Sequence, residues 1–232
     1  MTRNVYDGEM GSEVSRYDQV ADWYVEFTRS WGSEARTLLP EHLLGQRLLD
    51  MACGHGALSR VLARSGAVVT AIDLSSSLLA HATQKESTDR LGICYLCADA
   101  TTTDWWDGNP FDGVVCNMAL MDIDDLDAAL STVSAVLKRG GWFSFSLLHP
   151  CFPGGHDGST DALPSWPPDR GYSSEGWWTT GSDGVRGHVG ANHRKLSTYL
   201  NAVLQAGFDF VEFAEPASVV PRYFTARCRQ RT

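Results

Sequence analysis

A short run of small residues near position 50 has the composition of a loop that binds a ligand with its backbone. Residues 48–58 read Leu-Leu-Asp-Met-Ala-Cys-Gly-His-Gly-Ala-Leu, and Leu58, Val61 and Leu62 then recur at helical spacing. This pattern predicts a strand, a tight loop and a helix. Gly54 and Gly56 carry no side chain, so a ligand can lie directly on the backbone, and the free amides at the helix start favour negative groups or lone pairs.

An acidic residue at the end of the next strand narrows the class of ligand. The apolar run 67–72 ends at Asp73, and an acid at this position commonly accepts hydrogen bonds from both hydroxyls of a ribose. The glycine loop by itself is also consistent with a plain strand–helix–strand unit in which the glycines form only an ordinary turn. A dinucleotide-binding loop needs a third glycine for close helix packing, but Ser59 stands at that position. A nucleoside cofactor is therefore expected, and an oxidoreductase that uses a dinucleotide is disfavoured.

Residues 50–56 resemble the first motif, Asp-x-Gly-x-Gly-x-Gly, of the Rossmann-like (class I) S-adenosylmethionine-dependent methyltransferases, with Ala52 in place of the first glycine. The resemblance covers roughly residues 45–150 and continues in family order through residues 72–73, 97–100, 111–117 and 137–141. It implies an α/β fold with a doubly wound, seven-stranded, mostly parallel sheet, in which the seventh strand runs antiparallel between the fifth and the sixth. It also implies S-adenosylmethionine as the cofactor and S-adenosylhomocysteine as its product.

Different strand ends would recognise different parts of this cofactor. Amides of the glycine turn suit the amino-acid part, Asp73 the ribose, and Asp99 the adenine amine. The resemblance adds a Tyr-Asp-x-x-Ala-x-x-Tyr segment at residues 17–24, whose tyrosines often meet the methionine carboxylate in the family. Asp99 could instead cap a turn, and Met121 could simply pack in the core. The expected cofactor-binding residues are Tyr17, Tyr24, Ala52, Cys53, Gly54, Gly56, Asp73, Leu74, Leu78, Asp99, Ala100, Asn117, Met118 and Met121.

Two histidines are candidates for catalysis. Methyl transfer is an in-line displacement that the enzyme promotes by positioning and desolvation, and a base is needed only when the nucleophile arrives protonated. His149 follows the fifth predicted strand, and Pro150 keeps its backbone extended. His193 lies in a segment, residues 189–201, that resembles small-molecule members of the family, as does the His-Pro-Cys-Phe segment 149–152. Either histidine could instead be structural, with catalysis by positioning alone.

Aromatic residues in a long aperiodic segment suggest what the acceptor is. Residues 149–194 are rich in Pro, Gly, Ser and Asp and also contain tryptophans, which predicts a substrate lid rather than disorder. Aromatic faces beside a carboxylate suit an amine-bearing ring. We therefore expect N-methylation of an aromatic or heterocyclic amine, for example of indole type, in specialised metabolism. O-methylation, C-methylation and a cofactor-binding scaffold without turnover are the alternatives. The expected substrate-binding residues are Trp23, Trp166, Tyr172, Glu175, Trp177 and Trp178, although any of these tryptophans could merely hold the lid in place.

Composition excludes several other classes. The chain has 232 residues and a net charge of −9, whereas binding to nucleic acid usually needs a basic stripe. A small neutral or cationic acceptor fits this charge better. No apolar run is long enough to span a membrane and no apolar signal region begins the chain, so a cytoplasmic location is expected. Cys94 and Cys97 form a lone Cys-x-x-Cys inside a predicted strand, so no metal site is expected. The oligomeric state is not predicted.

All of these features are expected to belong to one domain that covers residues 1–232. A helical cap is expected over 1–44, with one helix from Ser15 and a second from Ser33 to Leu44 that is broken or kinked near Pro40. The cofactor-binding core covers 45–148, the lid 149–195, and a C-terminal helix with two strands 196–232. Two core helices are expected, one from Ser76 with a serine N-cap and one from Asp124 to Gly140-Gly141. The predicted strands are 46–51, 67–73, 93–98, 112–117, 142–148, 208–215 and 223–229.

Overall fold

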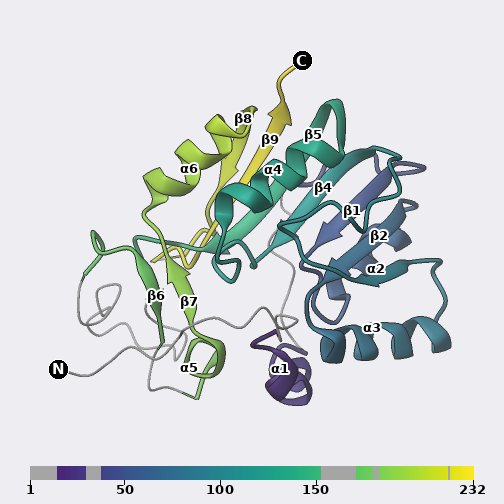
Figure 1. Cartoon of the computed structure of the whole chain (residues 1–232), viewed down its shortest axis with the longest axis horizontal. Coiled ribbons are helices and arrows are strands. Elements are labelled where there is room, and N and C mark those ends of the chain that lie inside the picture. The colour runs from purple at the N-terminus through teal and green to yellow at the C-terminus, as the bar shows by residue number, and fades with distance from the viewer. Residues whose placement is uncertain (1–14, 30–37, 153–170, 180–182, 219) are drawn as a thin grey trace.

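A seven-stranded sheet forms the centre of the protein. The computed structural model describes residues 15–29, 38–152, 171–179, 183–218 and 220–232. Strand order is β3-β2-β1-β4-β5-β9-β8, with β9 antiparallel to both of its neighbours and β1 to β5 mutually parallel. The predicted α/β fold and the position of the antiparallel strand are confirmed (Figure 1). The strands are β1 (Arg47–Met51), β2 (Val68–Asp73), β3 (Cys94–Cys97), β4 (Phe111–Asn117), β5 (Leu137–Leu148), β8 (Phe208–Ala214) and β9 (Tyr223–Gln230).

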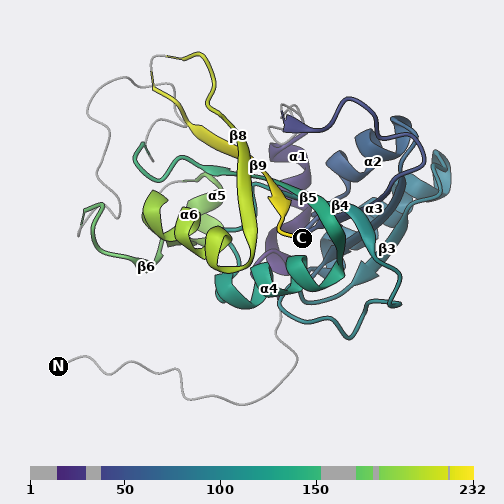
Figure 2. The same cartoon turned by 90° about the horizontal axis from the view of Figure 1, so that it is seen from above.

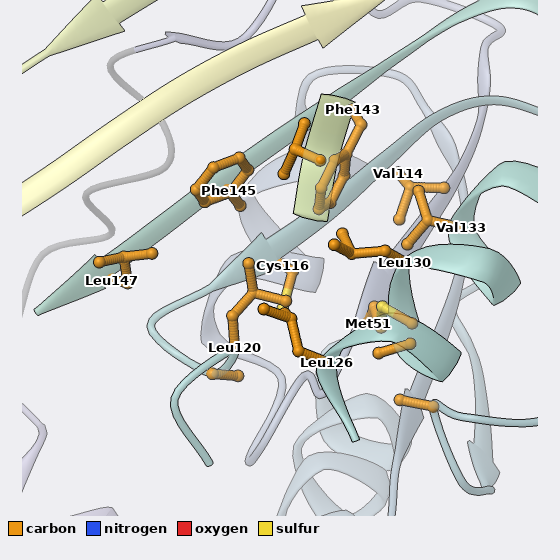
Figure 3. Packing of buried hydrophobic residues seen from close by; sticks show 14 of the residues in the cluster. Met51, Val114, Cys116, Leu120, Leu126, Leu130, Val133, Phe143, Phe145 and Leu147 are labelled. Atoms are coloured by element: carbon orange, nitrogen blue, oxygen red, sulfur yellow. The ribbon is translucent and has the colours of Figure 1, made fainter. Parts of the chain in front are cut away.

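Helices cover both faces of this sheet (Figure 2). Because side chains alternate along a strand, Leu48 of β1 packs with α2 (Ala57–Arg64) on one face, while Leu49 packs with α4 (Leu126–Val136) and α6 (Leu196–Gln205) on the other. Figure 3 shows Met51, Cys116 and Phe145 of the strands directed toward Leu130 of α4. Two buried layers thus fix the strand ends, at which the loops that could bind a ligand begin.

Side-chain caps define where the core helices begin. The predicted cap Ser75 accepts a hydrogen bond from the Leu78 amide at 3.1 Å, and α3 runs over Ser76–Thr88. Asp125 caps α4 through the Ala128 amide at 2.9 Å. The expected end of α4 at Gly140-Gly141 is wrong, because the helix ends at Val136. The glycines instead form an irregularity in the pairing of β5 with β4, where Gly140 has φ +69° and a side chain on Gly141 would meet the Lys138 carbonyl.

The first helix of the N-terminal cap begins later than expected. Within the described residues 15–29, the cap forms a 3₁₀ turn, η1 (Asp18–Val20), followed by α1 (Ala21–Phe27). The second cap helix was expected over residues 33–44 with a break near Pro40, and residues 39–44 are not helical. Pro40 lacks an amide hydrogen and restricts the residue before it, which explains why no helix continues to Leu44.

The expected lid contains regular structure where it is described. The strands β6 (Gly176–Trp178) and β7 (Ala191–His193) form an antiparallel pair, and the short helix α5 (Val185–Val189) lies between them in the chain. Trp178 and Ala191 join the main hydrophobic core. These three elements were not predicted from the sequence, because each has five residues or fewer and is too short to show a hydrophobic periodicity. We therefore interpret this part of the segment as a fixed wall of the domain.

Replacing Gly56 with alanine is expected to destabilise the protein more than replacing Gly54. Both glycines have positive φ angles, but a Cβ on Gly56 would lie 2.4 Å from Tyr95 Oη, whereas a Cβ on Gly54 would meet nothing within 4 Å. Backbone strain alone should cost Gly54→Ala about 1 kcal/mol. Overpacking raises the expected cost of Gly56→Ala to about 3 kcal/mol. Denaturant unfolding of both variants measures this difference, and equal losses would contradict the close contact with Tyr95.

Candidate active site

A cavity of about 370 Å³ lies at the carboxyl ends of β1, β2, β3 and β4. Ligands of open parallel sheets bind at this edge. Residues from each of these strand ends line the cavity, together with residues of the N-terminal cap and of the loop after β4. Most of the expected cofactor residues lie in this lining: Tyr17, Tyr24, Ala52, Gly54, Asp73, Leu74, Leu78, Asp99, Ala100, Asn117 and Met118.

Two non-glycine residues with left-handed backbone conformations line this cavity. Ala52 has φ 55° and Met118 has φ 56°, and they are the positive-φ residues other than glycine in the described chain. Such conformations are unfavourable for L-residues and concentrate at ligand sites. The angle at Ala52 gives a physical reason for the glycine that the resembling motif has at this position, because glycine adopts positive φ without strain.

Asp73 connects the two loops that form the floor of the cavity. Its Oδ2 accepts the Gly54 amide at 2.7 Å, and its Oδ1 accepts the Ser75 amide at 2.8 Å. Burial raises the pKa of the Asp73 carboxyl, and these two hydrogen bonds oppose that shift. Each carboxylate oxygen can accept more than one hydrogen bond, so the side chain keeps acceptor capacity for ribose hydroxyls.

Asp50, the acid before the loop, lies beneath the cavity rather than in its lining. Its side chain is 1% exposed and accepts a hydrogen bond from Ser59 Oγ at 2.5 Å. Burial raises the pKa of this carboxyl to about 7, and the charge of Asp73 adds to the shift. Ser59, which replaces the third glycine of a dinucleotide loop, therefore holds the first acid of the motif.

The cap is attached to the cavity through polar contacts of its first residues. Asp18 accepts hydrogen bonds from Ser75 Oγ at 2.6 Å and from the Ser77 amide at 3.1 Å, at the N-terminus of α3. Tyr17 and Tyr24 pack edge to face, with ring centroids 4.9 Å apart. The role of Asp18 was missed, although an acid in the Tyr-Asp segment that could reach a helix N-terminus was a usable signal.

The loop after β4 forms a wall of the cavity that was not predicted. Asp122, Ile123, Asp124 and Asp125 all line the cavity. Arg194 holds this loop by donating to the carbonyls of Leu120, Ile123 and Asp124 at 3.1, 2.9 and 2.7 Å. Further contacts come from the Asn192 amide, which donates to the Met121 carbonyl at 2.8 Å, and from Arg16, which pairs with Asp124 at 2.6 Å. The three acids in the short loop between β4 and α4 were the signal that could have found this wall.

Three expected cofactor residues lie behind the lining. Cys53 is half-buried and donates its amide to the Ile72 carbonyl at 2.9 Å. Gly56 caps α2 against Tyr95, and Met121 is a buried core residue. Asp99 lines the cavity and also closes a turn, because its Oδ1 accepts from the amide and the hydroxyl of Thr101, each at 2.8 Å.

The two candidate histidines lie outside this lining. His149 is 3% exposed, and its Nδ1 accepts the Cys151 amide at 3.1 Å. The proton of a neutral imidazole is then on Nε2, which donates to Glu215 at 2.7 Å. His193 is 3% exposed in β7, and its Nε2 donates to the Tyr172 carbonyl at 2.7 Å. Both rings thus make structural contacts.

The expected substrate residues also lie outside this lining. Trp178 is buried in the core, and Trp177 is half-exposed with its ring against Gly190. Tyr172 and Glu175 hold the start of α6: Tyr172 Oη accepts the Leu196 amide at 2.9 Å, and Glu175 accepts the Lys195 amide at 2.8 Å.

Trp23, the substrate residue expected from the cap, packs between two side chains. Its ring centroid lies 4.7 Å from that of Phe27 and 4.1 Å from that of His188, a residue of α5. Trp166 lies outside the described residues. From the described part of the expected lid, Val189 lines the cavity.

Two classes of site are not seen in the parts of the chain that the structure describes. No group of three or more His, Cys, Asp and Glu side chains there could hold a metal ion. No helix within the described ranges has the length and apolar character needed to cross a membrane.

Sequence comparison finds relatives that transfer methyl groups. Residues 49–145 match a family described as "Methyltransferase domain". A ubiquinone biosynthesis O-methyltransferase from Coxiella burnetii is 29% identical over 144 residues, which are 56% of this chain and 61% of that protein. A malonyl-[acyl-carrier protein] O-methyltransferase from Pectobacterium atrosepticum is 30% identical over 148 residues, 64% of this chain and 56% of that protein. The chain thus spans less than two thirds of either relative.

Solved structures share the fold over most of the chain. An S-adenosylmethionine-dependent methyltransferase from Mesorhizobium loti has a TM-score of 0.68 at 28% identity, covering 90% of this chain and 98% of that one. A 1,6-didemethyltoxoflavin-N1-methyltransferase from Burkholderia thailandensis, solved with S-adenosylhomocysteine, has a TM-score of 0.66 at 17% identity, covering 94% and 87%. Residues 49–145 thus match the methyltransferase domain family, and the sheet has the class I, Rossmann-like fold of the S-adenosylmethionine-dependent methyltransferase from Mesorhizobium loti.

Proposed function

We propose that this protein transfers the methyl group of S-adenosylmethionine to a small molecule. The observation that carries the proposal is the convergence of residues from four strand ends and the cap on one cavity. The backbone of the loop after β1, the carboxylate of Asp73 and the tyrosines of the cap all lie around this cavity. This arrangement is what a ligand with an amino-acid part and a nucleoside part requires.

The chemistry of the lining fits this cofactor. Asp73 would accept the ribose hydroxyls, and Asp99 would accept the adenine amine beside the apolar wall of Leu74 and Leu78. The backbone around Gly54 and Asn117 would face the amino-acid part. The bound cofactor supplies a methyl group on a positively charged sulfur, and the acidic lining favours a ligand of that charge.

Positioning is the catalytic contribution that these residues support. The cavity at the strand ends would hold the acceptor in line with the transferred methyl group and shield it from water. An unprotonated amine needs no base, and both candidate histidines make contacts outside the lining. His149 and His193 are accordingly proposed as structural residues rather than bases.

For the acceptor we propose an aromatic or heterocyclic amine, with N-methylation as the reaction. The support is chemical: the cavity lining contains one arginine, Arg16, against five aspartates, Asp73, Asp99, Asp122, Asp124 and Asp125. This excess of carboxylates favours a cationic or neutral group over an anionic one. The described aromatic residues of segment 171–178 lie outside the cavity lining. The O-methyltransferase names of the curated relatives make O-methylation of a small aromatic molecule the second candidate. A cofactor-binding scaffold without turnover is the third.

A turnover assay that compares two groups of acceptors, amines and phenols, tests this function. The purified protein is incubated with methyl-labelled S-adenosylmethionine and either aromatic amines and indoles or phenols of matched size. We expect a labelled N-methyl product with at least one amine and less transfer to its matched phenol. Preferred transfer to phenols would support O-methylation instead, and cofactor binding without any transfer would support a scaffold.

Replacing His149 with glutamine is expected to leave the chemical step nearly intact. The amide of glutamine can still donate to Glu215 but cannot act as a base. For an amine acceptor we expect kcat to stay within about threefold with an unchanged pH profile, because loss of a general base costs about 100-fold or more. Wild-type and variant rates measured across pH check this. A large loss of kcat together with loss of one limb of the pH profile would identify His149 as the base.

A further inference from the structure

A buried ion pair joins the expected lid to the cofactor cavity. Arg186, in α5, is 9% exposed and pairs with Asp122 of the loop after β4, 64 residues away in the sequence. Tyr17 of the cap donates its hydroxyl to Oδ2 of the same Asp122 at 3.2 Å. Three segments that are distant in the chain thus meet at one carboxylate, and both Asp122 and Tyr17 line the cavity.

We propose that Arg186 is a positioning residue for methyl transfer, which acts through Asp122 to hold Tyr17 against the cofactor. The proposal rests on the methyltransferase function proposed above. Arg186 itself is not among the residues of the cavity lining. Its effect on the reaction is therefore indirect, through the orientation of the two side chains that face the cavity.

The geometry makes Asp122 a fixed acceptor. Both terminal nitrogens of Arg186 face its carboxylate, with Nη2 at 3.4 Å from Oδ2, and Nη1 also donates to the Gly190 carbonyl at 2.8 Å. The guanidinium is thereby held between the carboxylate and the end of α5. A planar guanidinium can make these contacts together, whereas a lysine ammonium provides a single point of charge.

Charge compensation explains why Tyr17 depends on this pair. The Asp122 side chain is 17% exposed, and a largely buried carboxylate that loses its cation is strongly unfavourable. Burial and the Asp122 charge hold the pKa of the Tyr17 hydroxyl well above its ordinary value, so the phenol stays a donor. Without Arg186, Asp122 would turn toward solvent, and Tyr17 would lose its fixed acceptor.

A second buried arginine of the protein provides a matched control. Arg60 in α2 is 7% exposed and pairs with Glu86 at 2.9 Å and Asp89 at 2.5 Å. Its contacts lie on α3 and the residue after it, away from the residues that line the cavity. Removing either guanidinium breaks a buried ion pair, but only Arg186 is connected to the cavity.

The experiment compares Arg186→Met with Arg60→Met in the full chain. For each variant, the Kd for S-adenosylmethionine is measured by calorimetry, kcat by turnover and stability by thermal unfolding. We expect both variants to lose stability, Arg186→Met to weaken cofactor binding about tenfold, and Arg60→Met to keep its Kd within about twofold. Arg186→Lys should restore part of the affinity, because it returns the charge without the second contact.

A double-mutant cycle with Tyr17→Phe separates positioning from general destabilisation. If Arg186 acts through Asp122 and Tyr17, Arg186→Met should change the Kd much less in the Tyr17→Phe background than in the wild type. A full effect in that background, or equal Kd values for Arg186→Met and Arg60→Met at equal loss of stability, would overturn the proposal. Failure of the wild-type protein to bind S-adenosylmethionine would instead refute the proposed function, so the two failures are distinguishable.

Discussion

The carboxylate of Asp73 is the interaction on which the site depends. One oxygen accepts the amide of Gly54 and the other the amide of Ser75, so a single side chain fixes the loop after β1 and the start of α3 relative to each other. Ser75 also receives the cap, because its hydroxyl donates to Asp18. Hydrogen bonds thus connect the edge of the sheet to the two loops, and the loop at the start of α3 to the cap. A change at Asp73 would therefore disturb both the shape of the cavity and the ribose contact that we propose for this carboxylate.

The opposite wall of the cavity is held by cations from distant parts of the chain. Arg16 reaches it from the cap, Arg186 from α5 and Arg194 from the residue after β7. Three backbone carbonyls of the loop after β4 and the carboxylates of Asp122 and Asp124 accept hydrogen bonds from these side chains. The described part of the segment expected to be a lid thus acts as a support for the wall, and its Trp178 packs in the main hydrophobic core.

The sequence was informative where function and fold use local patterns. Alternating apolar runs and glycine turns predicted every strand of the main sheet to within two residues at its ends, apart from the extra residues of β5, and strand ends located Asp73, Asp99 and Asn117 at the cavity. It was uninformative where contacts are made at long range. The connection of Arg194 to residues 120–124 spans about seventy positions, and no periodicity encodes it. His149 was placed correctly after β5, whereas the strand that contains His193 was missed. The ring contacts of the two histidines with Glu215 and Tyr172 depend on such distant pairings.

Calorimetric titration with S-adenosylmethionine and with NAD is the most direct test of the central claim. The matched variants are Asp73→Ala and Asp112→Ala, since Asp112 lies at the other end of β4, where it accepts from the Arg47 amide and from Lys138. The account predicts micromolar binding of S-adenosylmethionine to the wild type and to Asp112→Ala, its loss in Asp73→Ala, and no comparable binding of NAD. Absence of S-adenosylmethionine binding by the folded wild-type protein, or a preference for NAD, would contradict the assignment of the cavity and every role derived from it.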